Sequence, residues 1–331
     1  MVSRSLPLLA LAGAALAAGC GGAAHPQRTV ARAPYGTAGF RSYAQARAAM
    51  AAAVRAEDGT GPELGPLPAR AFARPVARYR AYAGRQADAM ERDVAALGRA
   101  LASGDRVGAR AAWSRAYGRY LRIGAAYGAL GDLDVAIDGT PGHLTRGVRD
   151  PRFSGLHRIE RGLWRGATLA SLAPWTARLA RDVRTLRRVV RRVEIAPLDY
   201  ATRAHEILED AQRDMLSGRA APWSGAGLQA TADSLAATRA VIDTLRPLLD
   251  GRGDTLPPID TELLLFGRAL ERVRRAHGGR WPALDAMTRV EHEHVDGALG
   301  ALLEALAAVP GTLETRLPPK IPSIASQERR G

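Results

Sequence analysis

Two residues that could bind a metal ion stand three positions apart, His157 and Glu160, in the segment 153–164. On a helix, side chains with this spacing lie on one face, with Cβ atoms about 5–6 Å apart. An imidazole and a carboxylate so placed suit iron, zinc, copper or manganese. Two ligands are too few for a stable site, so we expect at least one more from elsewhere in the chain.

A short acidic run lies upstream of this pair, and its members Asp134 and Asp138 are four positions apart. A helical turn would place both carboxylates on one face. Like charges this close repel each other unless a cation or a set of arginines neutralises them. The run is therefore either part of a metal site or the partner of Arg146, Arg158 and Arg161.

A second acidic patch, formed by Glu206, Glu209 and Asp210, falls on a different predicted helix. Helical bundles build metal sites in their core from carboxylates and histidines of facing helices. The patch could supply such a ligand, or it could be a solvated face that pairs with Arg203 and Arg213. The sequence leaves both interpretations open.

The other histidines and the known catalytic motifs indicate no further site. His292 and His294 are two positions apart, so on a helix they point in different directions and do not share one ion. The chain has no His-Glu-x-x-His zinc motif, no Gly-rich phosphate loop and no Gly-x-Ser-x-Gly elbow. No motif in the sequence therefore indicates covalent or hydrolytic catalysis.

The elements that must position these residues are helices. The chain of 331 residues is rich in Ala, Leu and Arg and has almost no runs of β-branched residues, a composition with high helix propensity. Apolar periodicity, capping residues and Gly or Pro breaks predict helices over 42–57, 75–103, 105–130, 168–193, 197–217, 228–249, 260–277 and 282–307, with another around His157. The stretch 131–152 is the least helical. We predict an all-α fold whose antiparallel helices form two packed helical bundles.

The N-terminal segment is typical of a secretory signal. Arg4 is followed by an apolar run over 6–18, and small residues then lead to Cys20, the only cysteine of the chain. This order resembles a bacterial lipoprotein signal. We therefore predict a signal peptide over 1–19 and lipidation at Cys20, with no internal disulfide.

The rest of the chain divides into three predicted parts. Residues 20–41 have no clear period and are typical of a tether. A helical domain follows over 42–312, and residues 313–331 form a loose C-terminal tail. The predicted location is the cell envelope, with lipid anchoring to the extracytoplasmic face of the membrane.

The chain carries a formal net charge of +14, nearly all of it from arginine. Basic surfaces attract nucleic acids. Here, however, the arginines spread through every amphipathic segment, and no aromatic residues interleave with them as stacking platforms. Nucleic acid is not an expected partner. A solvated surface, or attraction to an anionic membrane or wall polymer, fits the secretory start better.

Several motifs together resemble one known family, the EfeO-type iron-uptake lipoproteins of the imelysin-like superfamily, over roughly residues 75 to 310. The motifs are the aromatic positions at 113, 117 and 120, the run at 131–134, the triplet at 137–139, and Gly-x-His-x-x-Glu at 155–160. The resemblance implies an all-helical fold of two bundles around a cleft. It also implies an extracytoplasmic metal-binding protein that works with an iron permease and a haem-dependent peroxidase.

The resemblance also implies which residues bind the metal. The motif ligands of the family fall on His157 and Glu160, and the acid after the upstream run falls on Asp138. An acid of a later helix falls on Glu206, with Asp210 as its alternative. Iron, as Fe²⁺ or Fe³⁺, is the expected metal, and Zn²⁺ or Cu²⁺ are alternatives.

Two features depart from the family pattern. Members often carry acids in the helix before the acidic run, where this chain has Gly124 and Gly128. Longer members carry an N-terminal copper-binding cupredoxin domain, and residues 21–41 are too short for one, so the chain resembles the short form. The glycines at 124 and 128 mean that this chain lacks acids that could complete the set of metal ligands in other members.

These observations lead to three hypotheses about function. The first is a lipid-anchored metal-binding component that captures iron and passes it to a membrane permease. The second is a metal-dependent peptidase, which needs a metal with an open water position and a nearby carboxylate base. The third is a structural envelope lipoprotein that binds no metal.

Overall fold

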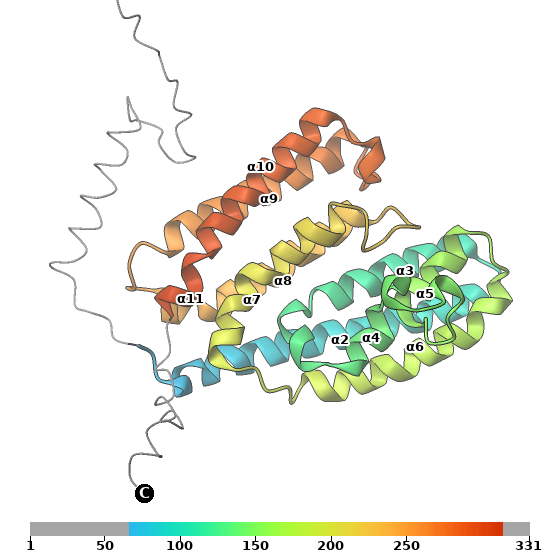
Figure 1. The fold of residues 1–331 in the computed structure, drawn as a ribbon, viewed down its shortest axis with the longest axis horizontal. Coiled ribbons are helices and arrows are strands. Elements are labelled where there is room, and N and C mark those ends of the chain that lie inside the picture. The colour runs from blue at the N-terminus through green and yellow to red at the C-terminus, as the bar shows by residue number, and fades with distance from the viewer. Residues whose placement is uncertain (1–65, 314–331) are drawn as a thin grey trace, which may run out of the picture. The chain divides into compact units, whose positions relative to one another are not determined.

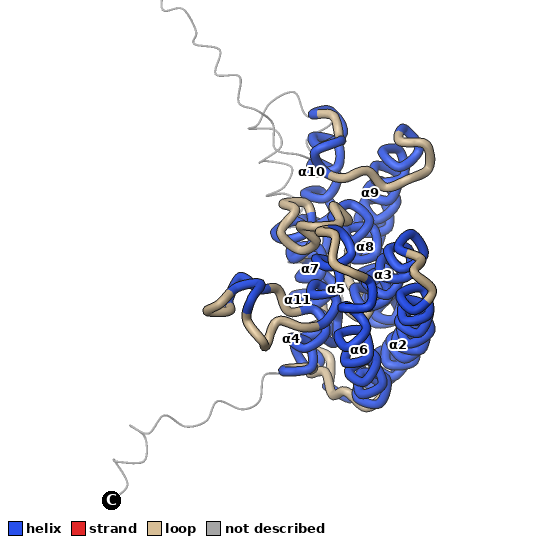
Figure 2. The backbone as a smooth tube through the Cα atoms, turned by 90° about the vertical axis from the view of Figure 1, so that its right-hand side faces the viewer, coloured by secondary structure: helices blue, strands red, loops and turns tan. Residues whose placement is uncertain are grey.

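The structure is a computed structural model that describes residues 66–313. The predicted signal peptide, Cys20, the tether, the helix over 42–57 and the tail from 314 onward lie outside the described residues. Residues 66–313 form helices joined by loops, with no β-strand, as Figure 2 shows, so the all-α prediction is confirmed. The helices are α2 (Ala73–Ala102), α3 (Arg106–Leu121), α4 (Asp132–Asp138), α5 (Gly155–Trp164), α6 (Leu169–Val190), α7 (Pro197–Asp210), α8 (Gly227–Leu249), α9 (Leu256–Ala276), α10 (Arg289–Leu306) and α11 (Ala308–Thr312).

These helices form two groups that pack against each other (Figure 1). The first group contains α2, α3, α5 and α6, with the short α4 against α5 and α6. The second contains α7, α8, α9 and α10, with α11 against α7. Helix α8 contacts α2 and α3 as well as α7 and α9, so it joins the two groups. The predicted pair of packed bundles is present.

Helix formation follows the apolar periodicity of the sequence. In α6 the buried side chains are spaced by four and three residues in turn: Leu172, Thr176, Leu179, Val183, Leu186 and Val190. This spacing keeps one stripe of the helix against the core. Asp105 caps α3, because its carboxylate accepts a hydrogen bond of 2.8 Å from the backbone N–H of Gly108.

Two boundaries differ from the prediction. Helix α3 ends at Leu121, and the chain continues as a 3-10 turn over Gly124–Ala129. A Cβ on Gly124 would lie 3.0 Å from Cγ1 of Ile207, so this turn packs closely on α7. The stretch 131–152 contains the two-turn helix α4, and it therefore has more helix than the sequence indicated.

One stretch of the described residues, Arg289–Thr312, is long and apolar enough to cross a membrane by length and composition alone. Its side chains Val295, Leu299, Leu302 and Leu306 are buried. They are spaced by three or four residues, and α10 packs against α9 and α7. This pattern is that of an amphipathic helix in a bundle.

Candidate metal centre

The motif Gly-x-His-x-x-Glu begins at Gly155, whose backbone lies in the left-handed region with a φ of 75°. A Cβ at this position would lie 2.2 Å from the carbonyl oxygen of Ile137 and 2.5 Å from that of Ala136. Glycine allows both the positive φ and this close approach. The first turn of α5 therefore presses on the last turn of α4, and this contact brings Asp138 to His157.

His157 lies between two carboxylates. Its Nδ1 is 2.8 Å from Oε2 of Glu160, and its Nε2 is 3.1 Å from Oδ1 of Asp138. The side chains of His157 and Glu160 are buried, whereas that of Asp138 is 24% exposed. The Asp138 contact is not aligned as a hydrogen bond, so this buried Oδ1 has no hydrogen-bond partner among the described residues. Solvent thus reaches the centre through the partly exposed side chain of Asp138, although its Oδ1 atom is buried.

The loop before α8 holds Glu160 in place. Oε1 of Glu160 accepts hydrogen bonds from the backbone N–H groups of Trp223, at 3.1 Å, and Ser224, at 2.8 Å, and from Oγ of Ser224, also at 2.8 Å. Because both carboxylate oxygens have partners, Glu160 can be buried at low cost. These residues lie between the helices predicted over 197–217 and 228–249. The contact joins positions 63 and 64 apart, and no local signal reveals it.

The two carboxylates change the charge state of His157. Burial by itself lowers the pKa of an imidazole, but the carboxylates of Asp138 and Glu160 outweigh it and raise the pKa of His157 to about 10. In this arrangement the ring is an imidazolium at neutral pH. A metal ion can bind His157 only after a ring nitrogen loses its proton.

Aromatic residues of α3 close the inner side of the centre. The ring of Tyr117 packs edge-on against His157, with centroids 5.4 Å apart. Tyr117 also stacks on Trp113, whose indole N–H donates a hydrogen bond of 2.8 Å to the carbonyl oxygen of Leu156. In the sequence these aromatic positions belong to the motifs that resemble the family. The structure adds that they fix the plane of the imidazole.

Asp134, one turn before Asp138 on α4, accepts a hydrogen bond from the hydroxyl of Tyr120. Burial raises the pKa of Asp134, the Tyr120 hydrogen bond lowers it, and the charge of Asp138 raises it further, with a net increase. The Arg203 guanidinium also acts on Asp134 and lowers its pKa. The two acids of α4 and the cation of α7 are therefore close enough to influence one another.

Arginines do not neutralise the acids of the centre. Arg158 donates a hydrogen bond of 2.8 Å to the carbonyl oxygen of Val148, and its guanidinium lies 4.6 Å from the ring centroid of Trp175. Among the described residues, no arginine forms an ion pair with Asp138 or Glu160, which meet His157 instead. The arginine alternative offered by the sequence is not what holds these acids.

The second acidic patch pairs with basic residues of its own helix and the turn that follows. The pairs are Arg203–Glu206 at 2.9 Å, His205–Glu209 at 3.4 Å and Arg213–Asp210 at 2.6 Å. This is the arginine-paired, solvated arrangement that the sequence had left open. The structure thus brings Asp138, His157 and Glu160 together, and it places Glu206 with Arg203 rather than with these three.

Within residues 66–313, no group of three or more His, Cys, Asp or Glu side chains is arranged to hold one metal ion. The reason is visible at His157, where Glu160 faces Nδ1 and Asp138 faces Nε2, on opposite edges of the ring. The pair formed by Oδ1 of Asp138 and Nε2 of His157 still suits an ion. Ligand atoms that each lie about 2.1 Å from a metal are themselves about 3 Å apart, and these atoms are 3.1 Å apart.

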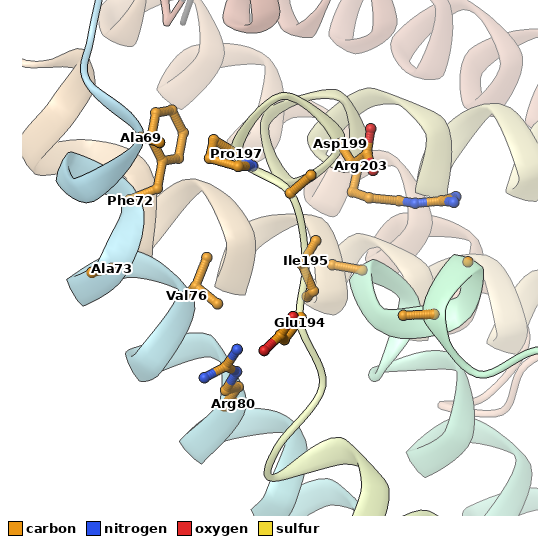
Figure 3. A pocket seen from close by; sticks show the side chains of 14 residues that line it. Ala69, Phe72, Ala73, Val76, Arg80, Glu194, Ile195, Pro197, Asp199 and Arg203 are labelled. Atoms are coloured by element: carbon orange, nitrogen blue, oxygen red, sulfur yellow. The ribbon is translucent and has the colours of Figure 1, made fainter. Parts of the chain in front are cut away.

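A cavity of about 970 Å³ lies near the start of α2. It is not lined by the candidate metal ligands Asp138, His157, Glu160 and Glu206. Figure 3 shows Arg80 near Glu194 in this cavity, with Asp199 and Arg203 farther along α7. Gly128 also lines it, and a Cβ there would lie 2.6 Å from Nη2 of Arg203. Arg203 thus fills the space that a side chain at position 128 would need.

The fold and the site together define a class: an all-helical, two-bundle protein with a buried histidine held between two carboxylates. The chain belongs to the imelysin family, whose sequence profile matches residues 75–257. The matched region runs from α2 to the start of α9 and contains Asp138, His157 and Glu160. The resemblance noted in the sequence is confirmed.

Similar curated proteins carry the name iron uptake system component EfeO. Those of Escherichia coli K12, Shigella flexneri and Shigella sonnei are each 24% identical to the chain over 239 residues. The similarity covers 72% of this chain and 63% of each relative, so the chain spans less than two thirds of their length. The similarity to EfeO-type proteins expected from the motifs is confirmed.

Proposed function

We propose that this protein is the extracytoplasmic metal-binding component of an iron uptake system, which captures iron and passes it to a membrane permease. Its membership of the imelysin family and its similarity to proteins named as iron uptake components support this. The observation that carries the proposal is the pair of atoms Asp138 Oδ1 and His157 Nε2, 3.1 Å apart and not hydrogen-bonded to each other. Carrying iron needs only reversible coordination, which requires no nucleophile.

In this proposal each residue of the centre has its own role in metal binding. Asp138 and His157 bind the iron through Oδ1 and Nε2. Glu160 accepts the hydrogen of Nδ1, and this fixes the ring and leaves Nε2 for the metal, as carboxylates behind metal-binding histidines commonly do. Glu206 supplies a further oxygen once it leaves Arg203, and Asp210 is its alternative.

The proposal extends to the organisation of the chain. Residues 1–19 direct export, Cys20 carries lipid, and 20–41 tether the metal-binding domain of 42–312, with a loose tail over 313–331. The partners are an iron permease and a haem-dependent peroxidase of the same system. Metabolic labelling with a fatty acid tests the anchor: wild type should carry the label and Cys20→Ala should not, and an unlabelled wild type would remove the anchor from the proposal.

Metal titration tests the centre itself. Calorimetry with Fe²⁺ under anaerobic conditions compares wild type with His157→Ala, and with His294→Ala, an exposed histidine, as the matched control. We expect one site in wild type, affinity at least about a hundredfold weaker in His157→Ala because a ligand is lost, and no change in His294→Ala. Equal stoichiometry and affinity in all three proteins would disprove the centre.

The peptidase hypothesis requires a free carboxylate base beside the metal. Glu160 does not offer one, because its Oε1 accepts three hydrogen bonds and its Oε2 faces His157. We expect no cleavage of an unfolded protein such as casein with Fe²⁺ or Zn²⁺ present. Cleavage that disappears in Asp138→Asn would reverse this assignment.

A further inference from the structure

Three arginines form a row on the exposed side of α6, and we call Arg184, Arg188 and Arg192 the α6 arginine row. Residues four positions apart lie above one another on a helix, and Arg192 continues the row just after the last residue of α6. Arg188 donates a hydrogen bond of 3.1 Å to Oγ1 of Thr185. Among the described residues, no carboxylate lies within ion-pair distance of any member of the row.

The row lines a surface hollow of about 330 Å³, and every residue that lines this hollow is an arginine. The remaining two are Arg187 and Arg191, which pair with Asp88 of α2 at 2.8 Å and 2.6 Å. Arg187 also pairs with Glu91. The acids of α2 thus pair with Arg187 and Arg191, whereas the row has no ion-pair partner among the described residues.

The row is costly for the helix that carries it. Like charges four residues apart destabilise a helix. Some exposed arginines elsewhere in the fold have acidic partners, such as Arg246 with Asp260 and Arg289 with Glu293, both at 2.7 Å. The sequence suggested arginines spread evenly through the helices. The structure places three of them on one face of α6, where they have no acidic partner among the described residues.

Figure 1 and Figure 2 place α6 along the side of the first bundle that is remote from α9 and α10. Helix α6 packs against α2 and α5 through its buried stripe. No described helix covers the face that carries the row, because all three arginines are exposed. A partner that approaches from outside therefore meets the guanidinium groups directly.

We propose that the α6 arginine row is the contact surface for a membrane of anionic phospholipids. Guanidinium groups bind phosphate through paired hydrogen bonds. At about 1.5 Å per residue, the row extends over roughly 12 Å, which suits several headgroups of a flat bilayer better than one small anion. This contact is independent of iron binding and of any lipid on Cys20, to which it would add a second attachment.

Vesicle sedimentation tests the contact. The chain from residue 21 onward, which contains the complete described fold, is expressed without the predicted signal and acylation site. Wild type is compared with the row variant R184Q/R188Q/R192Q and with the control variant R268Q/R272Q/R280Q. The control removes the same charge from three exposed arginines of α9 and the turn after it, which also have no acidic partner within ion-pair distance among the described residues. Circular dichroism verifies the fold of each variant.

We expect wild type to bind vesicles that contain phosphatidylglycerol and to bind phosphatidylcholine vesicles much more weakly. Each basic residue near an anionic membrane strengthens binding about fivefold, so the row variant should lose about a hundredfold and the control less than about fivefold. Equal losses in the two variants would show that net charge alone acts and would overturn the proposal. Three other results would also overturn the proposal. The wild type could bind all vesicles regardless of lipid charge, or millimolar inorganic phosphate could displace it completely. The row variant could also lose binding to DNA but keep binding to vesicles.

Discussion

Oδ1 of Asp138 lies 3.1 Å from Nε2 of His157, although the two residues belong to different helices, α4 and α5. The contact at Gly155 makes this possible, because the backbone of α5 approaches the carbonyl oxygens of Ile137 and Ala136 within the distance that only glycine permits. The centre is therefore a joint between two helices. Whatever separates α4 from α5 removes it.

Replacement of Gly155 by alanine tests this joint. The new Cβ would meet two carbonyl oxygens and would require a positive φ of 75°. We expect unfolding free energy to fall by about 3 kcal/mol or more, from backbone strain plus the clash, with loss of Fe²⁺ binding. Gly166→Ala is the matched control, since its φ is 80° but nothing lies within 4 Å of its Cβ. Equal losses of stability in urea denaturation would contradict the role of the contact.

Glu160→Gln should change the tautomer of the neutral His157 ring, which is the form that binds a metal ion, rather than the fold. The N–H groups of Trp223 and Ser224 keep the amide oxygen of the new residue on their side, so its NH₂ group faces Nδ1. Nδ1 must then accept a hydrogen bond, and the proton of the neutral ring moves to Nε2, where the metal would bind. We expect metal affinity to fall about 10–100-fold, with the ¹⁵N chemical shifts of His157 reporting the exchange. Unchanged affinity with the proton on Nδ1 would refute this.

Ser224→Ala removes one of the three hydrogen bonds to Oε1 of Glu160, together with a weaker one of 3.3 Å that Oγ of Ser224 accepts from the backbone N–H of Ala226, and it leaves the backbone donors to Glu160 in place. A hydrogen bond to a charged group contributes about 1.5–3 kcal/mol. Because Ser224 is only partly buried and water can replace its hydroxyl, we expect a loss of about 1.5 kcal/mol in thermal or urea unfolding. Ser217→Ala serves as the control, since that exposed hydroxyl bonds only to carbonyl oxygens nearby in its own turn. A loss no larger than in the control would count against the anchoring role of Ser224.

The pKa of His157, raised to about 10, makes the metal-free protein sensitive to pH. An unfolded histidine has a pKa near 6.5, so the stabilisation from the charged ring is complete below about pH 6.5 and is lost as pH rises toward 10. We expect the stability difference between wild type and His157→Gln to shrink over this range in urea titrations. A difference that stays constant would contradict the charged state.

Metal affinity should follow the opposite trend. Binding at Nε2 must displace a proton, so affinity should increase up to about tenfold per pH unit over the same range. Mn²⁺ is a suitable probe because it resists oxidation. In Asp138→Asn the ring loses one of the charges that raise its pKa, and we expect weaker binding whose pH dependence levels off earlier. Identical affinities and pH profiles for both proteins would show that Asp138 does not take part in metal binding.

The proposed role of Glu206 depends on its release from Arg203, from which it lies 2.9 Å away. If iron draws Glu206 into the site, Glu206→Gln should weaken Fe²⁺ binding several-fold and Arg203→Gln should strengthen it. Glu209→Gln is the control on the same helix, where the carboxylate pairs with His205. Titration calorimetry distinguishes these outcomes. If Glu206→Gln and Glu209→Gln both bind like wild type, Glu206 is not a ligand.

Much of the fold could be predicted because it follows from local pattern. The four-and-three spacing from Leu172 to Val190 specifies a helix with one buried stripe wherever it lies in the chain. The three-residue spacing of His157 and Glu160 places both on one face of a single helix, and they are in contact. Such relations depend only on helical geometry, which the sequence carries by itself.

The sequence by itself therefore determined the all-helical class, the course of most helices and the existence of an imidazole–carboxylate pair. The tertiary structure decided the rest: that Asp138 faces Nε2 while Glu160 faces Nδ1, that Ser224 anchors Glu160, and that the acids of α2 pair with Arg187 and Arg191 while no described acid pairs with the α6 arginine row. Each of these contacts joins separate helices or loops. The packing of whole helices in three dimensions decides which residues meet in these contacts. The periodicity within a single segment does not carry this information.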